Sequence, residues 1–530
     1  MRPRILALFG VVLLVSGTAL AADQPKRGGT LKVSYGNEIA NLDFHTAPGY
    51  EMMWVAMNVG CGLVNITPDG KFVGDAAESW QVAPDGLLYT FKLKKNVLFH
   101  DGTPVDAAAV RFSIERLMNP ATGSGMRSFF SAVDSVEALD PLTVQIRLKH
   151  PYAFMLHMLA GYRTGLVLYS PAATQKFSLD DRKQGKPDAV VGCGPFKLVE
   201  WVKGGHLVMD RFEKYFESGL PYLDRIVIRV IKDPITEMAA FKAGEIDFIA
   251  SFSPEHVDTM KTQNPKAQIM TGKETTPMLA QMRVTIPKDG KPMSKDRAPH
   301  PVFNDIRVRK AVGCYGIDRK EIVKIAFKGH ATPWVGIIPP GTLDTVDVNQ
   351  MCPYDQAKAK ALLAEAGYGP QKPLVFELMT NTEKSVFNVI ATVIKEQMSR
   401  IGVTANIRLV DKVTWMAAAN QDGPWDMYVE DLLSLLTLDS NAYLSTTQAA
   451  WNHSRHTDTK VDDYYMSYAR ELDPVKRKAI AKEFAEYSAD KLYWNTISGS
   501  PFYMVAQPWM KGYVYNAEFE VHFNKVWLDK

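Results

Sequence analysis

Hydrophobic and polar positions recur along the chain with two different periods. Residues 88–93 (LYTFKL) alternate at every second position, which predicts a half-buried strand. Residues 226–231 and 374–379 are mainly apolar and predict buried strands, whereas residues 385–400 have helical spacing up to a stop at Gly402. Strands that alternate with helices in this way predict α/β lobes with mixed sheets.

Residues 302–323 (VFNDIRVRKAVGCYGIDRKEIV) predict two consecutive helices with acidic starts. Asp305 opens the first helix, and Asp318 opens the second with Glu321 one turn further on, close to a capping box. The apolar positions of the first helix recur at helical spacing and are Ile306, Val308, Val312 and Cys314. By itself this pattern indicates well-capped helices and no particular function.

The length and charge of the chain narrow the class of protein. A chain of 530 residues is too long for one hydrophobic core, so we expect two or three lobes. Its 46% apolar and 22% charged residues are typical of a globular protein. The formal charge of +3 falls to +1 if Arg2 and Arg4 leave with a leader. Such a small charge disfavours a nucleic-acid partner or a strong attraction to a membrane surface.

The first residues are typical of a secretory leader. Arg2 and Arg4 form a positive end, residues 5–15 are apolar, and residues 19–21 (ALA) fit signal peptidase. The alternative, an uncleaved anchor, is disfavoured because the apolar run is shorter than the ~20 residues that span a bilayer. No Cys follows the run directly, which disfavours a lipid anchor. We therefore predict residues 1–21 to be a signal peptide, cleaved after Ala21, and an exported, periplasmic protein.

The cysteines leave their redox state open. Cys61, Cys193, Cys314 and Cys352 allow three complete pairings. Export permits disulfides, but the positions do not require one. Cys61 and Cys314 fall in apolar helical contexts, which favours small buried thiols over disulfides.

Catalytic and cofactor motifs are absent from the sequence. It contains no GxSxG, GxxxxGK[ST] or HExxH pattern, and residues 192–194 (GCG) lack the third glycine of a dinucleotide loop. His453 and His456 have a spacing that metal ligands use on a helix, but no third ligand accompanies them, so we expect surface histidines. We predict no catalytic residues, no metal ligands and no cofactor, although a triad of scattered residues would escape this search.

A series of segments in a fixed order carries a family resemblance. They are residues 28–31 (GGTL), 41–43 (NLD), 75–80 (DAAESW), 99–104 (FHDGTP), 192–196 (GCGPF), 241–248 (FKAGEIDF), 302–323, 354–368 (YDQAKAKALLAEAGY) and 511–513 (KGY). Together they resemble the bacterial extracellular solute-binding proteins of family 5, the periplasmic dipeptide-, oligopeptide- and nickel-binding proteins of ABC importers. Residues 302–323 are the most specific segment, and the resemblance covers almost the whole mature chain.

The resemblance implies an α/β fold of the two-lobed periplasmic-binding-protein type, class II, with an extra subdomain in the first lobe. On this basis lobe I comprises residues 22–285, with the subdomain at about 75–190. Lobe II comprises residues 286–497, and residues 498–530 return to lobe I. Residues 286–301, which are rich in Pro, Gly and charge, would then lie at the passage between lobes. Ligands of the family bind in the cleft between the lobes, and hinge closure needs few crossing segments.

The resemblance also implies cleft-lining residues. The segment after the first strand offers Tyr50, Glu51 and Met53, whose alternative is the start of a packed helix. Arg283 stands where the family usually carries Asn; beside the hinge it would hold a carboxylate, and its alternative is an internal ion pair. Trp334 offers a stacking face or is an ordinary packed tryptophan.

Residues 425–439 (WDMYVEDLLSLLTLD) depart from the peptide binders of the family. Where these carry a Gly-Trp pair, this chain has Asp431-Leu432, and their anchoring aspartate falls near Leu435. Glu430 and Asp431 remain as nearby acids, and a register slip would bring Asp431 or Asp439 to the anchor. An ammonium group buried without a carboxylate partner costs several kcal/mol. We therefore expect a ligand other than a simple free-ended dipeptide, such as a modified peptide, an opine-like conjugate, a sugar or a metal chelate.

The leading interpretation is the periplasmic solute-binding component of an ABC importer that delivers a small solute to a membrane permease and its ATPase subunits. We expect a monomer and no enzymatic activity. The rival interpretations are an exported hydrolase that uses the same cleft, and a periplasmic receptor or chaperone that serves a sensor. Turnover of a bound ligand separates the first rival, and uptake after gene deletion separates the second.

Overall fold

The computed structural model of the chain is described for residues 24–46, 50–160, 166–272, 274, 276–291, 293–342, 344–382, 384–432, 443–447, 449, 452–515 and 521–530. The predicted leader and its cleavage after Ala21 lie outside these residues. Among the described residues, no helix has the length and the apolar character needed to cross a membrane.

The first lobe is built on a mixed sheet with the strand order β12–β21–β11–β1–β10–β9–β8. Strand β1 lies between β10 and β11 and is parallel to both, and its apolar side chains Leu31, Val33 and Tyr35 share one face of the sheet and lie in the core of the first lobe. The strands are β1 (Thr30–Tyr35), β8 (Phe196–Val202), β9 (His206–Arg211), β10 (Arg225–Val230), β11 (Phe248–Phe252), β12 (Gln268–Thr271) and β21 (Tyr503–Ala506). The helices are α1 (Tyr50–Val59), α6 (Pro234–Lys242) and α7 (Val257–Gln263), with a 3₁₀ turn at Pro254–His256 and the strands β22 (Met510–Lys511) and β23 (Trp527–Leu528).

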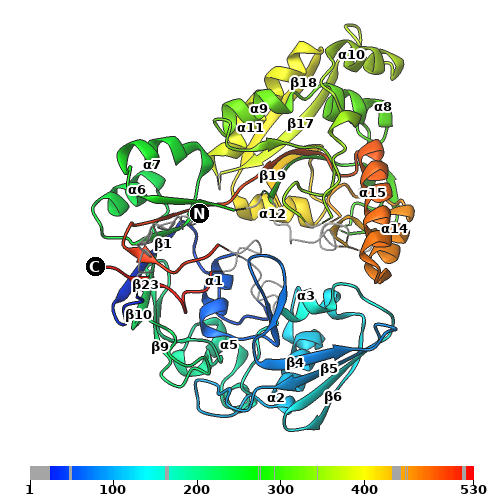
Figure 1. The fold of residues 1–530 in the computed structure, drawn as a ribbon. Helices are drawn as coiled ribbons and strands as arrows, with labels where there is room; N and C mark the ends of the chain where they lie inside the picture. The colour runs from blue at the N-terminus through cyan, green and yellow to red at the C-terminus, as the bar shows by residue number, and fades with distance from the viewer. Residues whose placement is uncertain are drawn as a thin grey trace, which may run out of the picture.

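A subdomain is inserted between β1 and β8 and projects below the first lobe (Figure 1). Its antiparallel sheet has the order β4–β5–β7–β6 and packs against α2 (Ala107–Met118). The strands are β4 (Ala77–Val82), β5 (Leu88–Leu93), β6 (Val133–Asp140) and β7 (Thr143–Leu148), preceded by the hairpin β2 (Val64–Ile66) and β3 (Phe72–Gly74). The other helices are α3 (Met155–Ala160), α4 (Pro171–Lys176) and α5 (Leu179–Lys183), with 3₁₀ turns at Pro120–Thr122, Arg127–Phe130 and Pro187–Ala189.

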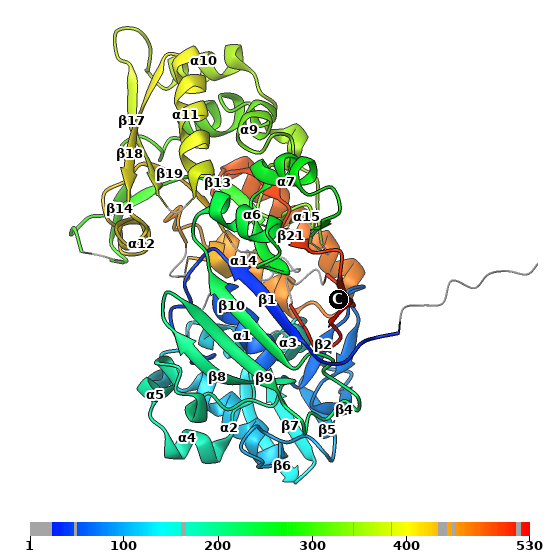
Figure 2. The same cartoon turned by 90° about the vertical axis from the view of Figure 1, so that its left-hand side faces the viewer.

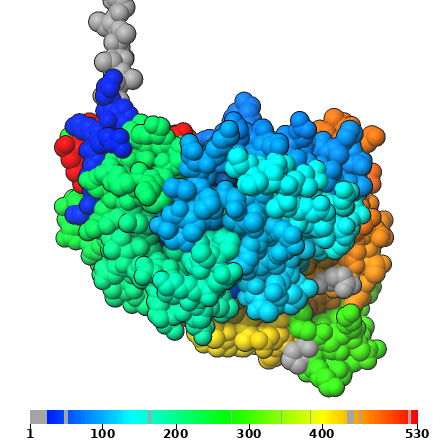
Figure 3. All heavy atoms as spheres, turned by 90° about the horizontal axis from the view of Figure 1, so that it is seen from below, coloured from blue at the N-terminus to red at the C-terminus, as the bar shows by residue number. Residues whose placement is uncertain are grey.

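The second lobe is built on a mixed sheet with the order β16–β20–β13–β19–β17–β18. Its strands are β13 (Thr276–Met282), β16 (Thr332–Pro333), β17 (Leu374–Asn381), β18 (Val403–Val410), β19 (Met427–Asp431) and β20 (Thr496–Ser500), and the hairpin β14 (Thr285–Pro287) and β15 (Arg297–Pro299) lies beside them. The helices are α8 (Ile306–Arg309), α9 (Arg319–Ala326), α10 (Gln356–Glu365), α11 (Ser385–Arg400), α12 (Lys412–Asn420), α14 (Lys460–Arg470) and α15 (Pro474–Lys491), with a 3₁₀ turn at Asn349–Met351. Seen from below, the subdomain lies beside the orange segment that holds α14 and α15 (Figure 3).

Local sequence signals explain several of these elements. The predicted strand 88–93 is β5, and the predicted helix 385–400 is α11, which ends before Gly402 at a positive φ of 79°. Asp305 and Asp318 cap α8 and α9 as expected. Glu321 completes no capping box, because its carboxylate instead accepts hydrogen bonds from Gln397 and Arg400.

The passages between the lobes differ from the expected boundaries. The chain leaves the first-lobe sheet after Thr271 and enters the second-lobe sheet at Thr276, and it returns between Ser500 and Tyr503. The return agrees with the position taken from the family, but the outward passage lies a full strand earlier than residues 286–301. That loop instead contains the β14–β15 hairpin, because β13 already pairs with β19 and β20 inside the second lobe.

The expectation of free buried thiols was wrong. Cys61 is bonded to Cys193 within the first lobe and its subdomain, with Cα atoms 5.2 Å apart, and Cys314 to Cys352 within the second lobe, 4.7 Å apart. Gly192 and Gly194 allow the first bond, because a Cβ on either glycine would lie within 2.0–2.5 Å of backbone oxygens of residues 59 and 60. Since neither bond joins the two lobes, neither restrains hinge motion.

Candidate functional site

The parallel strands of the second lobe end together on the side of the interlobe passages. Strands β17, β18 and β19 end at Asn381, Val410 and Asp431, and α11 and α12 begin directly after β17 and β18. We call this edge the carboxyl edge. The amide of Leu432, the next residue, donates to the carbonyl of Pro277, which follows the outward passage. Ligands of α/β sheets bind at such carboxyl ends, so this edge is the candidate site.

The carboxyl edge carries paired charges. Asn381 Nδ2 donates to the Glu430 carboxylate over 2.6 Å, and Lys412 Nζ donates to it over 3.2 Å. Lys384 Nζ lies 2.6 Å from the Asp431 carboxylate. Burial alone would raise the pKa of Asp431, but Lys384 and Lys412 outweigh it, and the pKa is lowered. The edge therefore presents anionic and cationic groups next to one another.

Accessibility distinguishes these groups. The Glu430 side chain is only 5% exposed, whereas the Lys384 and Asp431 side chains are 42% and 22% exposed. A solute at the edge can thus reach the Lys384–Asp431 pair directly, while Glu430 orients Lys412 from below. Leu432 is partly buried against the second-lobe core. Residues 433–442, which hold the rest of the apolar run and Asp439, lie outside the described residues.

The first lobe lies on the other side of the interlobe passages. Strands β1 and β10 run toward the second lobe (Figure 2), and α1 begins at Tyr50. The side chains of Tyr50 and Glu51 lie outside the described part of the chain. Met53, by contrast, is 3% exposed and belongs to the core of the first lobe. For Met53 the structure therefore favours the alternative of a packed helix.

Arg283 is not beside the hinge. It follows the end of β13 that is remote from the passage at Thr276, roughly 23 Å along the strand at 3.3 Å per residue. Its guanidinium is 3% exposed, lies 3.0 Å from Asp422 and donates to the carbonyl of Gly423 over 2.7 Å. Arg297 and Arg455 share Asp422 as well. The geometry is that of the internal ion pair, the alternative to a ligand contact.

Trp334 and the paired histidines are also buried. Trp334 is 5% exposed, and its Nε1 donates to the carbonyl of Ile338 over 2.5 Å, as in an ordinary packed tryptophan. The prediction that His453 and His456 lie on the surface was wrong. His453 bonds to the Tyr428 hydroxyl, and His456 to the carbonyl of Ser445 over 2.6 Å. Among the described residues, no group of His, Cys, Asp and Glu has the arrangement of a metal site.

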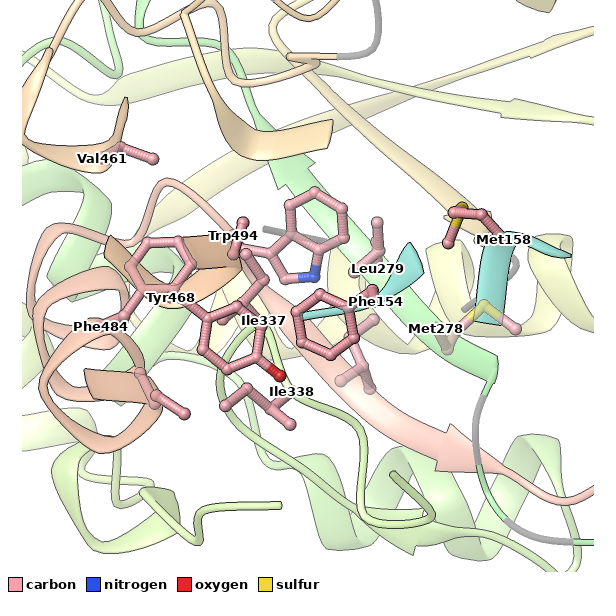
Figure 4. Close-up of a cluster of buried hydrophobic side chains, with 14 of the residues drawn as sticks. Phe154, Met158, Met278, Leu279, Ile337, Ile338, Val461, Tyr468, Phe484 and Trp494 are labelled. Carbon is pink, nitrogen blue, oxygen red and sulfur yellow. The ribbon is translucent and has the colours of Figure 1, made fainter. Parts of the chain in front are cut away.

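An apolar contact joins the lobes at the far side of the cleft. We call it the seam: residues 152–160 of the subdomain packed against α14, α15 and β13. Phe154 stacks on Tyr468 with ring centroids 5.1 Å apart, and the guanidinium carbon of Arg477 lies 5.3 Å from the centroid of the Phe154 ring. The amide of Ala153 donates to the carbonyl of Ala469 over 2.8 Å. Figure 4 shows Phe154 among second-lobe side chains, with Leu279, Ile337, Ile338, Tyr468 and Trp494 nearby.

The hinge side of the same boundary is polar. His330 of the second lobe lies 3.2 Å from Asp258 on α7 of the first lobe, and its ring meets Tyr503 edge-on with centroids 6.1 Å apart. Glu274 lies in the outward passage itself, and burial raises its pKa. The described arrangement therefore has interlobe contacts at both ends, which is the geometry of a closed form.

Comparison with known proteins identifies the family. The family of bacterial extracellular solute-binding proteins, family 5, matches residues 71–454, more than half of the chain. The glutathione-binding protein GsiB of Escherichia coli K12 is 28% identical over 487 residues, covering 89% of each chain. The structure of AgaA of A. tumefaciens R10 in complex with agropinic acid has a TM-score of 0.80 at 25% identity, covering 95% of this chain and 99% of AgaA.

A third relative shares the fold. The murein tripeptide binding protein MppA of E. coli has a TM-score of 0.80 at 22% identity, covering 95% of this chain and 98% of MppA. Against the unliganded open form of MppA the score is 0.71, with 95% and 97% covered. Both comparisons show the same fold.

The chain belongs to the bacterial extracellular solute-binding proteins of family 5. It is the solute-binding component of an ABC importer and binds small solutes, and the family consists of transport receptors without enzymatic activity. The predicted family and the predicted α/β, class II periplasmic-binding-protein fold are confirmed. Homologues are periplasmic or extracellular binding proteins.

Sequence reasoning missed Asn381, Lys384 and Lys412. All three stand at or just after the end of a strand that leads into a helix, and both strand-to-helix junctions were visible in the sequence. Attention to the junctions would have found them. Phe154 and Tyr468 had no comparable signal, because nothing in either segment shows that the two meet.

Proposed function

We propose that the chain captures a small zwitterionic, peptide-derived solute between its lobes and presents the closed form to a membrane permease with its ATPase subunits. The observation that carries the proposal is the exposed Lys384–Asp431 pair at the carboxyl edge. A carboxylate of the solute would replace Asp431 as the partner of Lys384, and an ammonium group of the solute would form a new ion pair with Asp431. Exchange of one ion pair for another avoids leaving a buried charge unpaired.

The relatives agree with this chemistry. GsiB is a glutathione-binding protein, AgaA was solved with agropinic acid, and MppA binds a murein tripeptide. We infer that this chain takes a solute of the same broad kind, other than a simple free-ended dipeptide. The exclusion of a simple free-ended dipeptide rests on the sequence, where an apolar run stands in place of the anchoring aspartate of peptide binders. Tyr50, Glu51, Glu430 and Leu432 complete the proposed set of cleft-lining residues.

The cellular setting is part of the proposal. The leader pattern supports export with cleavage after Ala21, so that the mature periplasmic chain begins at Ala22. N-terminal sequencing of exported protein tests this cleavage. Loss of solute uptake on gene deletion tests the permease, and turnover of the bound solute would instead indicate the rival exported enzyme.

The solute is identified by mass spectrometry of what gently purified protein releases on unfolding. Calorimetry then compares that solute with a panel of dipeptides. Lys384→Met should weaken binding by ~1.5–3 kcal/mol, the range for a lost hydrogen bond to a charged group. Lys482→Met is the matched control, because Lys482 forms an exposed ion pair with Glu486 on α15. Tight binding of ordinary dipeptides would contradict the inference that the solute is not a simple dipeptide, and equal effects of the two substitutions would contradict the proposed site.

A further inference from the structure

A cavity of about 270 Å³ lies beside the seam, and the seam residues Tyr152 and Ala469 belong to its lining. Its walls come from both lobes. The subdomain contributes Ser128, Phe129, Ser131, Ala132, His150 and Tyr152, and the second lobe contributes Tyr443, Thr446, Asp462, Tyr465, Met466, Ala469 and Arg470. None of these residues belongs to the carboxyl edge, so the cavity is a separate site.

Aromatic rings form the walls of this seam cavity. Phe129 of the subdomain faces Tyr443 of the second lobe with ring centroids 5.2 Å apart. The ring centroid of Tyr443 in turn lies 5.7 Å from that of Tyr465 on α14. Tyr152 is 3% exposed, and Met466 adds a polarisable thioether. Such a lining favours a flat apolar ligand that meets ring faces and edges.

Polar groups are confined to a few positions of the lining. Asp462 accepts hydrogen bonds from the amide of Thr447, over 2.7 Å, and from its hydroxyl. A carboxylate has about four acceptor positions, so Asp462 retains capacity for a further donor. His150 and Arg470 are the basic side chains of the lining. An aromatic ring that carries one N–H or O–H group matches this distribution.

We propose that the seam cavity is an accessory site for a small aromatic molecule with a hydrogen-bond donor, of the size of an indole or a phenol. Its volume corresponds to about nine water molecules at ~30 Å³ each, which is enough for one such ring system. Because both lobes build the walls, the complete site exists only when the lobes are closed. An occupant therefore has a higher affinity for the closed form and shifts the population toward it.

This assignment makes the accessory ligand an effector of solute capture. By thermodynamic linkage, a molecule that favours closure raises the affinity for the transported solute, and the solute raises the affinity for the effector by the same factor. The effect differs from competition, because the two ligands occupy different places along the same interlobe boundary.

The test uses the full mature chain and indole as the probe. Calorimetry measures indole binding, and small-angle scattering measures the radius of gyration with and without indole. Ser131→Trp fills the cavity from its exposed rim and should abolish indole binding. Ser467→Trp, at an exposed position of α14 outside the lining, is the matched control and should leave indole binding unchanged. A thermal melt of both variants checks that they fold.

We expect indole to reduce the radius of gyration of the unliganded protein and to raise the affinity for the solute released from the purified protein at least fivefold. Indole binding that survives Ser131→Trp, or that leaves the radius unchanged, would overturn the proposal. A parallel measurement with the released solute distinguishes failure of the accessory site from failure of solute-driven closure. If that solute compacts the protein and indole does not, only the accessory site fails; if neither does, closure itself fails too.

Discussion

The two ends of the interlobe boundary differ in chemistry. At the hinge, the contacts are the His330–Asp258 pair and the partly buried Glu274 of the outward passage. At the seam, Phe154 and Tyr468 are 1% and 0% exposed and pack against an apolar surface. The hinge side is polar, whereas the seam is mainly apolar.

This difference assigns different tasks to the two ends. Apolar burial is the larger and less directional contribution, at roughly 25 cal/mol per Å² removed from water, and it is lost when the surfaces separate. An ion pair with exposed partners contributes little by itself but fixes geometry. We infer that the seam sets the free energy of the closed form, whereas the hinge contacts guide how the lobes meet.

The largest expected effect is at the seam. Phe154→Ala should destabilise the closed form by about 3 kcal/mol, the lower end of the range for buried Phe→Ala. Since every solute needs closure, all affinities should fall by the same factor, with no change in the order of preference. Calorimetry with several solutes measures this, with Leu139→Ala as the control because Leu139 is 52% exposed in the subdomain. Unchanged affinities would show that the seam does not set the free energy of the closed form.

The buried arginines around Asp422 lie at neither end of the interlobe boundary, so their loss should change the stability of the protein and not its solute affinity. Arg283→Ala should lower the free energy of unfolding by about 2 kcal/mol, less than the 3–5 kcal/mol for breaking an isolated buried pair, because Asp422 keeps Arg297 and Arg455. Solute affinity should stay the same. Denaturant unfolding and calorimetry together test this. Weakened binding with normal stability would instead restore Arg283 as a ligand contact.

Acid should weaken the seam. Burial, with the charge of Arg477 on α15 adding to it, lowers the pKa of His157 on α3 to about 4. A lowered histidine pKa means that the contact favours the neutral ring, so closed-state stability is present at pH 7 and falls below the ordinary pKa of 6.5. Solute affinity should drop by up to about tenfold between pH 7 and 5. His157→Gln should flatten this dependence; a profile that stays equally steep would mean that other groups cause it.

The smallest effect is expected at the hinge. Asp258→Asn removes the partner of His330, and Asp258 is 67% exposed, so the change in solute affinity should stay below about 1 kcal/mol. Raising the salt concentration should erase even this difference, because exposed charges are screened. A loss as large as that of Phe154→Ala would invert the roles of hinge and seam.

Local patterns predicted much of the fold, and distant contacts escaped prediction. The helix 385–400 followed from its period and from Gly402, both of which lie within one segment. Arg283 pairs with Asp422, 139 residues further along the chain, and Cys61 with Cys193 at a separation of 132 residues. No local sequence pattern shows that residues so far apart in the chain are in contact. The outward passage was misplaced because loop composition cannot show that β13 already pairs in the second lobe.

The candidate site was predicted in part for the same reason. Glu430 and Asp431 were selected through the family resemblance, as acids near the expected anchoring position, and both lie at the carboxyl edge. Their partners Lys384 and Lys412 come from two other strand ends, which only the parallel pairing of β17 with β18 and β19 brings together. The resemblance to the family supplied the order of the segments but no side-chain contacts.

Small-angle scattering of the mature protein with and without its released solute tests the central claim most directly. The account predicts a smaller radius of gyration at saturation, and a Phe154→Ala variant that needs a higher solute concentration to reach the same compact form. A radius that is identical with and without solute, while calorimetry shows that the solute is bound, would contradict capture by closure of the two lobes.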